Sequence, residues 1–275
     1  MKVADRIKEY YEDRTKTFLM RRMVTIIRLD GKGFSKWTKN LKKPFDEGFT
    51  DDMIETAKYL CESIQGAKFA YAQSDEISIV LTDFDNLESQ AWFDYNVQKM
   101  TSIAASMATA KFNQLRMARN VVDTEDGYNS VGIMAFKLAM FDARVFQVPT
   151  VDEMVNTMIW RQQDATRNSV SMAAYEICGH SATMNMSGSE KQEMLFDKGV
   201  NWNDYPVKFK RGTVIRKVEK LMTRKPSGDS NKTTMIDENL IFTRNVWEAD
   251  EDTPIFTQNK EYLSNLVTPK VNGTN

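Results

Sequence analysis

Short apolar runs and a helical repeat alternate along the first part of the chain. Residues 24–29, 69–72 and 77–81 are rich in aromatic and β-branched side chains, as half-buried strands are. Between the first two runs, residues 51–65 place apolar side chains at helical spacing. The polar tetrad at 73–76 separates the last two runs, so the pattern predicts a strand, a helix and a hairpin.

A second helix and two further strand-like runs follow the hairpin. Residues 87–117 form a long helical pattern whose alanine-rich centre allows close packing against a sheet, and residues 133–140 and 143–148 again have strand character. The order strand, helix, two strands, helix, strand is that of a ferredoxin-like unit. We therefore predict an α+β fold in which helices pack on an antiparallel sheet.

Helical patterns also flank this unit on both sides. Residues 3–22 predict an amphipathic helix. Residues 151–177 predict a long helix with acidic side chains in its first turn, where negative charge suits the helix dipole, and 189–198 a short one. The last residues begin with a linker-like stretch, so we predict a main domain over 1–225 and a C-terminal extension over 226–275.

The composition limits the classes of partner and site. The chain has 275 residues, and its 37 Lys and Arg nearly balance its 38 Asp and Glu, so a nucleic acid must be held by a local basic patch. No apolar run approaches a membrane span, and we expect a soluble, cytoplasmic protein. The one histidine, His180, lies in a turn outside the candidate motifs, which leaves no histidine-dependent nucleophile triad.

Carboxylates follow two of the predicted strands. Asp30 ends the first strand beside Gly31, and Asp75 and Glu76 lie in the hairpin connection. If the strands are neighbours, these three carboxylates converge and call for cations, and hard oxygen ligands suit Mg²⁺ or Mn²⁺ in phosphoryl transfer. In the alternative interpretation, Asp75 and Glu76 solvate a turn and Asp30 caps a loop. Two acidic turns after buried strands favour a site.

A lysine-rich loop follows Asp30. Residues 32–43 contain five lysines. Such a loop is usually a solvated surface, but beside a metal site its cations suit the oxygens of a triphosphate.

Several long segments of the chain carry a resemblance to a known family. They are, in order, IIRLDGKGFSKWTKNLKKPFD (26–46), AYAQSDEISIV (70–80), FDARVFQVP (141–149), WRQQDATRNS (160–169), and MLFDKGVNW with KFKRGTVI (194–215). They closely resemble the motifs of the tRNA(His) guanylyltransferase family, which includes bacterial and archaeal 3′-to-5′ polymerase-like members. The agreement covers about residues 20–217.

The resemblance implies a fold, a reaction and a set of partners. It implies a catalytic polymerase-type palm, ATP and GTP as substrates, tRNA as the acceptor of nucleotides at its 5′ end, and a homotetramer. By the same resemblance, two Mg²⁺ ions would be held by Asp30, the Gly31 carbonyl and Asp75, with Glu76 beside them as a catalytic residue.

The resemblance and the charge pattern together suggest binding residues. We expect nucleotide contacts at Arg28, Lys32, Gly33, Phe34, Lys43, Asp46, Ser74 and Lys99. We expect tRNA contacts at Arg161, Asn168, Lys208, Lys210 and Arg211, the last three from the densest basic stretch of the chain. For Arg161, a surface ion pair with Asp164 at i+3 is the alternative.

One helix departs from the family pattern. The dedicated eukaryotic enzymes carry His-Ile-Asn-Asn where this chain has Thr166-Arg167-Asn168-Ser169. This difference favours templated repair of tRNA 5′ ends over strict selection of tRNA(His). Two other hypotheses stay open at this point: another palm-type reaction such as that of a nucleotide cyclase, and a tRNA-binding module without catalysis.

Overall fold

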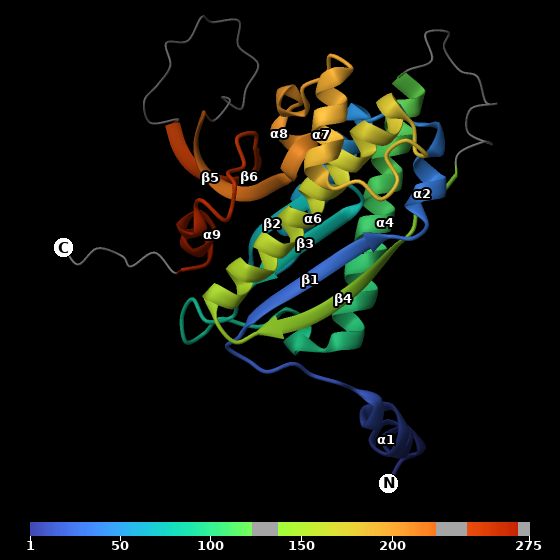
Figure 1. The fold of residues 1–275 in the computed structure, drawn as a ribbon. Coiled ribbons are helices and arrows are strands. Elements are labelled where there is room, and N and C mark those ends of the chain that lie inside the picture. Colours follow the sequence, from blue (N-terminus) through green and yellow to red (C-terminus); the bar gives the residue numbers. More distant parts are fainter. Residues whose placement is uncertain (123–136, 224–240, 269–275) are drawn as a thin grey trace, which may run out of the picture.

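The computed structural model describes residues 1–122, 137–223 and 241–268. Its centre is a six-stranded antiparallel sheet in the order β4-β1-β3-β2-β5-β6 (Figure 1). The strands are β1 (Val24–Gly31), β2 (Ala67–Gln73), β3 (Glu76–Leu81), β4 (Phe141–Val148), β5 (Thr213–Thr223) and β6 (Ile241–Asp250). The α-helices are α1 (Val3–Ile7), α2 (Phe34–Trp37), α3 (Glu47–Ser63), α4 (Val97–Val122), α6 (Val151–Cys178), α7 (Gly188–Asp197), α8 (Val207–Arg211) and α9 (Lys260–Val267). Short 3₁₀ or π turns occupy η1 (Lys8–Glu12), η2 (Asp13–Thr15), η3 (Thr38–Asn40), η4 (Trp92–Tyr95) and η5 (Trp202–Asp204).

The ferredoxin-like prediction is confirmed. The elements β1, α3, β2, β3, α4 and β4 follow one another along the chain, and their four strands lie in the order β4-β1-β3-β2. This order places β1 and β3 at the centre of the unit, and α3 and α4 both pack on the same face of the sheet (Figure 1).

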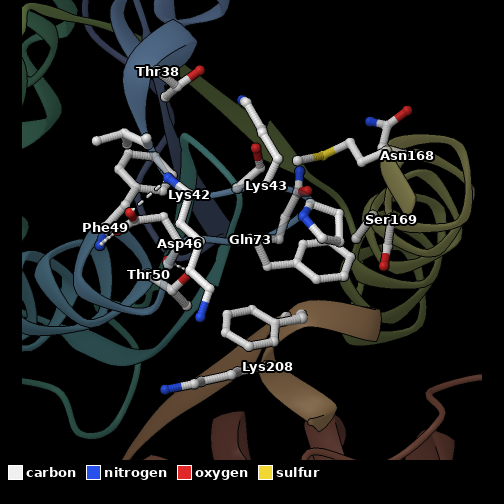
Figure 2. A pocket seen from close by; sticks show the side chains of 18 residues that line it. Thr38, Lys42, Lys43, Asp46, Phe49, Thr50, Gln73, Asn168, Ser169 and Lys208 are labelled. Atoms are coloured by element: carbon white, nitrogen blue, oxygen red, sulfur yellow. Dashed lines mark hydrogen bonds between the residues drawn. The ribbon is translucent and has the colours of Figure 1, made fainter. Parts of the chain in front are cut away.

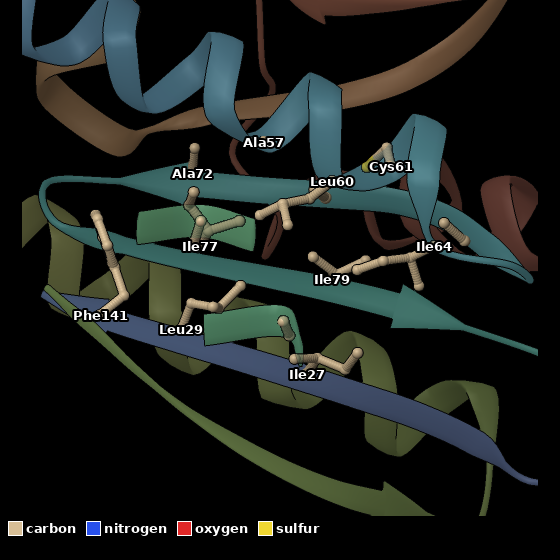
Figure 3. Close-up of a cluster of buried hydrophobic side chains, with 14 of the residues drawn as sticks. Ile27, Leu29, Ala57, Leu60, Cys61, Ile64, Ala72, Ile77, Ile79 and Phe141 are labelled. Carbon is tan, nitrogen blue, oxygen red and sulfur yellow. The ribbon is translucent and has the colours of Figure 1, made fainter. Parts of the chain in front are cut away.

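Alternation along the strands gives the sheet two buried faces. Ile27 and Leu29 of β1 join the core beneath α3 and α4 (Figure 3), whereas Val24 and Ile26 point to the opposite face, which α6 and α9 cover. Burying one such side chain contributes roughly 1.5–3 kcal/mol. Every second residue of β1 therefore faces α6, and this parity continues to Asp30.

The first long helix has its predicted buried stripe, and it begins earlier than predicted. Met53, Ala57 and Leu60 are buried against the sheet, as expected from their spacing. The helix starts at Glu47 because the Asp46 carboxylate caps it, accepting a hydrogen bond from the Phe49 amide at 2.7 Å.

Two expected helices differ from the structure. The predicted helix over 3–22 ends with η2 at Thr15 and buries none of its residues. It stands apart from the body of the molecule (Figure 1), so its apolar pattern does not indicate a core contact within this chain. The predicted helix at 87–117 begins only at Val97, since the preceding residues form an irregular loop with left-handed backbone at Phe93 and Asp94.

Part of one predicted strand lies outside the described residues. Residues 133–136 belong to that part, and the adjoining residues 137–140 are not a strand. Asn113 of α4 holds this segment instead, because its amide donates to the Ala139 carbonyl and its oxygen accepts from the Ala139 amide, both at 2.9 Å.

The C-terminal residues complete the sheet and one core layer. The predicted boundary at residue 225 lies outside the described residues. β6 pairs with β5 along its whole length, and Leu263 and Val267 of α9 are buried in the core beside Val24 and Ile26. Among the described residues no helix is both long and apolar enough to cross a membrane.

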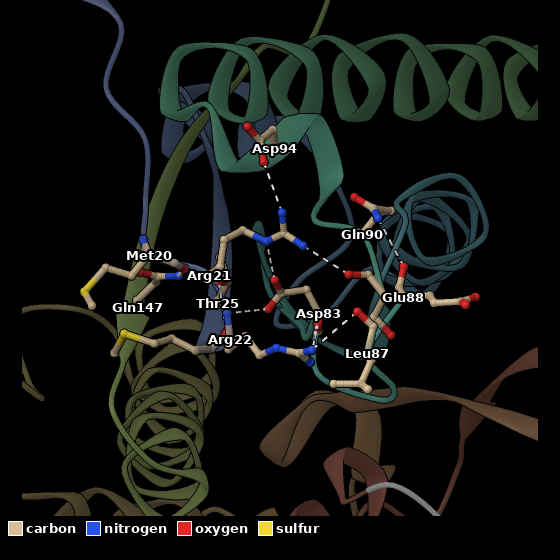
Figure 4. A network of polar contacts seen from close by, with 12 residues as sticks. Met20, Arg21, Arg22, Thr25, Asp83, Leu87, Glu88, Gln90, Asp94 and Gln147 are labelled. Carbon is tan, nitrogen blue, oxygen red and sulfur yellow. Dashed lines mark hydrogen bonds and ion pairs between the residues drawn. The ribbon is translucent and has the colours of Figure 1, made fainter.

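A polar network ties down the start of β1, at the end of the sheet away from Asp30 (Figure 4). The buried Asp83 carboxylate accepts a hydrogen bond from Arg21 Nε at 2.6 Å and one from the Arg22 amide at 2.8 Å. Arg21 also reaches Asp94 at 3.2 Å. The chain therefore enters β1 along a defined path.

The ion pairs between α3 and α4 generate a stability prediction. Asp52 is buried and lies 3.0 Å from Arg116 and 2.8 Å from Arg119. Asp52→Asn removes the carboxylate partner of the buried Arg116, so we expect it to lower the free energy of unfolding by about 3 kcal/mol. Glu55→Gln, on the same helix but in an exposed pair with Lys58, is the control, with a change below about 0.5 kcal/mol. Urea denaturation measures the free energy of unfolding of both variants. Equal losses would contradict the role of Asp52 as the counterion of a buried arginine.

Candidate active site

The end of β1 meets the tip of the β2–β3 hairpin. Only Ser74 and Asp75 connect the two hairpin strands, and Ser74 has a left-handed backbone with φ of 49°. On the neighbouring strand Asp30 lies directly opposite Glu76, and the Gly31 amide donates to the Asp75 carbonyl at 3.1 Å. The backbone therefore brings the residues of the two acidic turns together.

The surroundings of Asp75 within the protein disfavour its ionised form. Burial raises its pKa above the usual value, and the negative charges of Asp30 and Glu76 raise it further. Hydrogen bonds from its own backbone and from the Ser74 hydroxyl, which lies at 3.2 Å, oppose this shift only in part. A cation bound beside Asp75 would favour its ionised form.

Glu76 differs because it has a cationic partner. Its carboxylate lies 2.8 Å from Arg161 Nε, and the two residues are only 6% and 8% exposed. The described residues contain no group of three or more His, Cys, Asp or Glu side chains that could hold one ion. The three carboxylates converge as expected, but Glu76 is neutralised by Arg161, so the uncompensated pair is Asp30 and Asp75.

Arg161 is buried beneath the acidic pair. Its guanidinium pairs with Glu76 and, at 3.0 Å, with Asp164. The tRNA contact expected at Arg161 stays a prediction, since its guanidinium is already engaged by two carboxylates. The alternative of a surface ion pair is incomplete, because the pair with Asp164 extends into a buried one.

A pocket opens beside the hairpin tip (Figure 2). Its walls come from the segment 38–50, which runs from η3 into the first turn of α3, and from the hairpin, the middle of α6, and α8 with the turn after it. It is lined by Thr38, Leu41, Lys42, Lys43, Pro44, Phe45, Asp46, Phe49, Thr50, Gln73, Ser74, Ala165, Asn168, Ser169, Met172, Lys208, Phe209 and Gly212. Phe45 stacks on Phe209 with ring centroids 5.0 Å apart, which gives the pocket a flat aromatic wall. The expected nucleotide residues Lys43, Asp46 and Ser74 thus line one cavity with the expected tRNA residues Asn168 and Lys208.

Asp46 supports the lysine loop that forms part of this pocket. One carboxylate oxygen caps α3, and the other accepts from the Lys42 amide at 3.1 Å. Both oxygens thus hold the backbone that presents Lys42 and Lys43, whose side chains are exposed.

Gly33, Lys32 and Phe34 form the turn after β1. Gly33 has φ of 67°, a conformation that glycine adopts without strain, and the exposed Lys32 donates its amide to the Met140 carbonyl at 2.8 Å. Phe34 is buried, with its ring centroid 5.1 Å from that of Phe141. The Phe34 ring therefore belongs to the core under Gly31, so only its backbone is placed to meet a ligand, and the nucleotide contact expected there stays a prediction.

Lys99 lies far from this pocket in its own chain. It is in the first turn of α4, whose start is tied to the N-terminal segment by a hydrogen bond from the Val97 amide to the Thr17 carbonyl. That end of the sheet holds the start of β1, and Asp30 lies at the other end. Lys99 is therefore separate from this pocket within the chain, and the nucleotide contact expected there stays a prediction.

The basic stretch at 208–220 is largely matched by the chain's own acceptors. Lys208 lies 2.9 Å from Asp51, and Arg211 donates to the Thr253 carbonyl at 3.1 Å. Lys210 bonds the Asn203 carbonyl, and burial lowers its pKa. On the neighbouring strands Arg216 pairs with Asp250 and Lys220 with Glu248. The expected tRNA surface at Lys208, Lys210 and Arg211 is thus not a free basic patch.

Comparisons with known proteins agree with this geometry. The family model described as "Thg1: tRNAHis guanylyltransferase" matches residues 4–149, more than half of the chain. The chain belongs to the tRNA(His) guanylyltransferase family. It is therefore a nucleotidyltransferase, as the resemblance predicted.

Individual relatives place the chain within this family. A bacterial tRNA(His) guanylyltransferase-like protein solved in complex with ATP is 38% identical, with a TM-score of 0.78 over 97% of this chain and 99% of that one. The same comparison with a bacterial protein of this description in complex with GTP gives a TM-score of 0.73 at 38% identity. The tRNA(His) guanylyltransferase of Debaryomyces hansenii is 28% identical over 72% of this chain and 75% of its own length. The Saccharomyces cerevisiae enzyme shares the fold, with a TM-score of 0.61 and 24% identity over 75% of this chain and 92% of that one.

Two residues that the sequence reasoning missed lie beside the acidic pair. Asp142 and Arg144 of β4 lie directly opposite Asp30 and Arg28 of β1, so the guanylyltransferase-family motif in β4 borders the site. Both side chains are exposed. The alternation within FDARVFQVP was the available signal, since it places these two residues on one face of a strand.

The raised pKa of Asp75 generates a prediction about pH. Because the folded-state pKa lies above the unfolded one, ionised Asp75 destabilises the metal-free fold at neutral pH, and this cost disappears as pH falls through the folded pKa. We expect metal-free Asp75→Asn to be at least as stable as the wild type at pH 7. Its advantage should shrink toward pH 4, as measured by thermal denaturation between pH 4 and 8. Asp46→Ala, which removes a helix cap, is the control and should lose about 1 kcal/mol at pH 7.

The Glu76–Arg161 pair generates a second prediction. Arg161→Met should lower the free energy of unfolding by about 3 kcal/mol, because Glu76 is left buried without its cation. Adding Glu76→Gln should recover much of this loss in urea denaturation. Arg167→Gln removes an exposed arginine that also pairs with Asp164, and it should change stability by less than about 0.5 kcal/mol. Additive losses in the double variant would show that Glu76 does not depend on Arg161.

Proposed function

We propose that this enzyme adds nucleotides to the 5′ end of tRNA in the 3′-to-5′ direction, with ATP and GTP as substrates. The observation that carries the proposal is the uncompensated pair Asp30 and Asp75 beside a pocket bordered by Lys42 and Lys43. An acidic pair suits metal-assisted phosphoryl transfer, and exposed lysines suit the triphosphate. The ATP and GTP complexes of the 38% identical bacterial proteins support the same nucleotides here.

The proposed reaction has two steps. In the first, an oxygen of the tRNA 5′-monophosphate attacks the α-phosphorus of ATP, and pyrophosphate leaves. In the second, the 3′-hydroxyl of the incoming GTP attacks the activated 5′-phosphorus, and AMP leaves. Lys42 and Lys43 would bind phosphate oxygens, and the flat wall of Phe45 and Phe209 would orient a base, so the pocket would mainly position charge and reacting atoms.

The donor set fits divalent metal. Asp30 and Asp75 offer carboxylate oxygens, and the Gly31 carbonyl adds a neutral oxygen, which is the ligand type that Mg²⁺ and Mn²⁺ take. Bound metal would lower the pKa of the attacking hydroxyl and neutralise triphosphate charge. Arg161 would keep Glu76 oriented beside this pair.

We further propose templated repair as the biological activity. The pocket wall on α6 includes Asn168 and Ser169, which belong to the segment that departs from the eukaryotic guanylyltransferase motif. The identity to the bacterial guanylyltransferase-like proteins, 38%, exceeds the 24% to the yeast enzyme. Base pairing with the opposite strand would then supply the specificity. The homotetramer implied by the family resemblance is part of this proposal, and light scattering tests it.

The metal assignment has a test with two readouts. Asp30→Asn and Asp75→Asn should each lower the rate of nucleotide transfer to 5′-monophosphorylated tRNA at least 100-fold, because charge compensation in the transition state is lost. Mg²⁺ or Mn²⁺ should raise the melting temperature of the wild type but not of either variant. Glu55→Gln is the control for both measurements. Near-wild-type transfer in Asp30→Asn would refute the two-metal assignment.

The repair proposal is tested with a panel of acceptors. On several tRNA species that lack their 5′-terminal nucleotide, the enzyme should add the nucleotide that pairs with the opposing base. It should prefer these acceptors at least tenfold to full-length tRNA(His), measured as kcat/KM with all four triphosphates. Exclusive addition of G to tRNA(His), whatever the opposing base, would instead support the dedicated guanylyltransferase activity.

A further inference from the structure

Trp160 on α6 is a large aromatic side chain that stays half exposed beside the acidic pair. Its relative exposure is 51%, although two guanidinium groups lie over its ring, Arg161 at 4.4 Å and Arg28 at 5.7 Å from the ring centroid. Cation–π contacts of this kind hold an indole in a defined orientation. The exposed part of the ring is therefore a rigid apolar surface, which is suited to contact a flat partner.

The position of Trp160 links it to the reacting centre but not to the nucleotide pocket. Arg28 precedes Asp30 by two residues on β1, so both side chains face α6 and lie about 7 Å apart along the strand. Arg161, the second cation over the indole, is paired with Glu76. Neither Trp160 nor Arg28 lines the pocket, so the indole borders the acidic pair from another side.

The charges around the indole are those that bind a phosphate. Arg161 is neutralised by Glu76 and Asp164, but no carboxylate of the described residues lies within ion-pair distance of Arg28. Arg144 lies directly opposite Arg28 on β4 and is exposed. Its nearest carboxylate, that of Asp142, is 3.8 Å away, which is longer than a hydrogen bond. A surplus guanidinium next to an exposed indole matches a nucleotide, with a base for the ring and a phosphate for the arginines.

We propose that Trp160 is the stacking platform for the terminal base at the 5′ end of the RNA acceptor, with Arg28 and Arg144 contacting its phosphates. The RNA end then enters along the edge between β4 and α6, while the nucleoside triphosphate enters from the pocket on the other side of Asp30 and Asp75. This assignment rests on the proposed function, because it makes the acceptor an RNA 5′ end. It gives the two substrates separate routes to one reacting centre.

The test measures whether Trp160 and the terminal base interact with each other. The probes are a 5′-monophosphorylated tRNA lacking its first nucleotide, and the same tRNA with an abasic residue at its new 5′ terminus. In fluorescence anisotropy, Trp160→Leu should weaken binding of the first probe about 10-fold, and Trp160→Phe less than 3-fold. The abasic probe should bind the wild type about 10-fold more weakly than the first probe, but Trp160→Leu should bind both alike. The KM for ATP should not change.

A matched control lies on the same helix. Tyr175 also carries a cation over its ring, Lys191 at 5.0 Å, and is partly exposed, but it lies about 22 Å further along α6. Tyr175→Leu should leave the difference between the two probes as in the wild type. Thermal denaturation of all variants, and the retained aromatic ring in Trp160→Phe, separate stacking from loss of folding.

The outcomes distinguish this proposal from the proposed function. If Trp160→Leu still binds the abasic probe 10-fold more weakly, the base stacks elsewhere and the proposal is overturned. If Trp160→Leu instead lowers the mass seen by light scattering and leaves RNA affinity unchanged, the indole is a contact between copies of this chain, which also overturns it. If the difference depends on Trp160 but the wild type transfers no nucleotide to any tRNA, the platform stands and the proposed reaction fails.

Discussion

The pairing register of β1 against β3 is the constraint on which the site depends. It sets Asp30 opposite Glu76 and brings Gly31 to the hairpin turn that carries Asp75. Because side chains alternate along a strand, a slip of one residue would turn Asp30 toward α3 and α4. Its charge would then be buried in the apolar core that Ile27 and Leu29 occupy. The apolar contacts on both faces of β1 oppose such a slip. The core therefore stabilises the position of the acidic residues as much as the fold itself.

The carboxylates at this edge of the sheet are of two types, one compensated within the protein and one not. Glu76 is buried and has Arg161 as its counterion, so its charge is compensated within the protein. Asp75 has a raised pKa because burial and Asp30 both disfavour its ionised form. Leaving one anion pair uncompensated costs stability in the metal-free protein, and a bound cation would offset this cost. Because Arg161 compensates Glu76, this cost comes only from Asp30 and Asp75, the pair beside the pocket.

Charge compensation also explains why the richest basic segment is not a free surface. Arg216 and Lys220 of β5 meet Asp250 and Glu248 of β6, and Lys208 meets Asp51 of α3. These contacts join the C-terminal strand and α8 to the central unit. Cations with no acidic partner among the described residues, such as Arg28 and Lys43, lie at the acidic pair and the pocket instead. An overall charge near zero is thus compatible with polyanionic substrates, because the available cations lie next to the site.

The sequence by itself determined the order of the elements, the buried stripe of α3, and the two acidic turns, because periodicity and turn residues are local properties of a chain. Its motifs also determined the family. Only the tertiary structure decided that Arg161, 85 residues from Glu76, neutralises it, that Phe34 is core, and that Lys99 lies at the far end of the sheet. It likewise placed the Arg28 guanidinium over the ring of Trp160. These outcomes depend on strand order and register, which join residues distant in the chain, and no local pattern encodes which charge will find which partner.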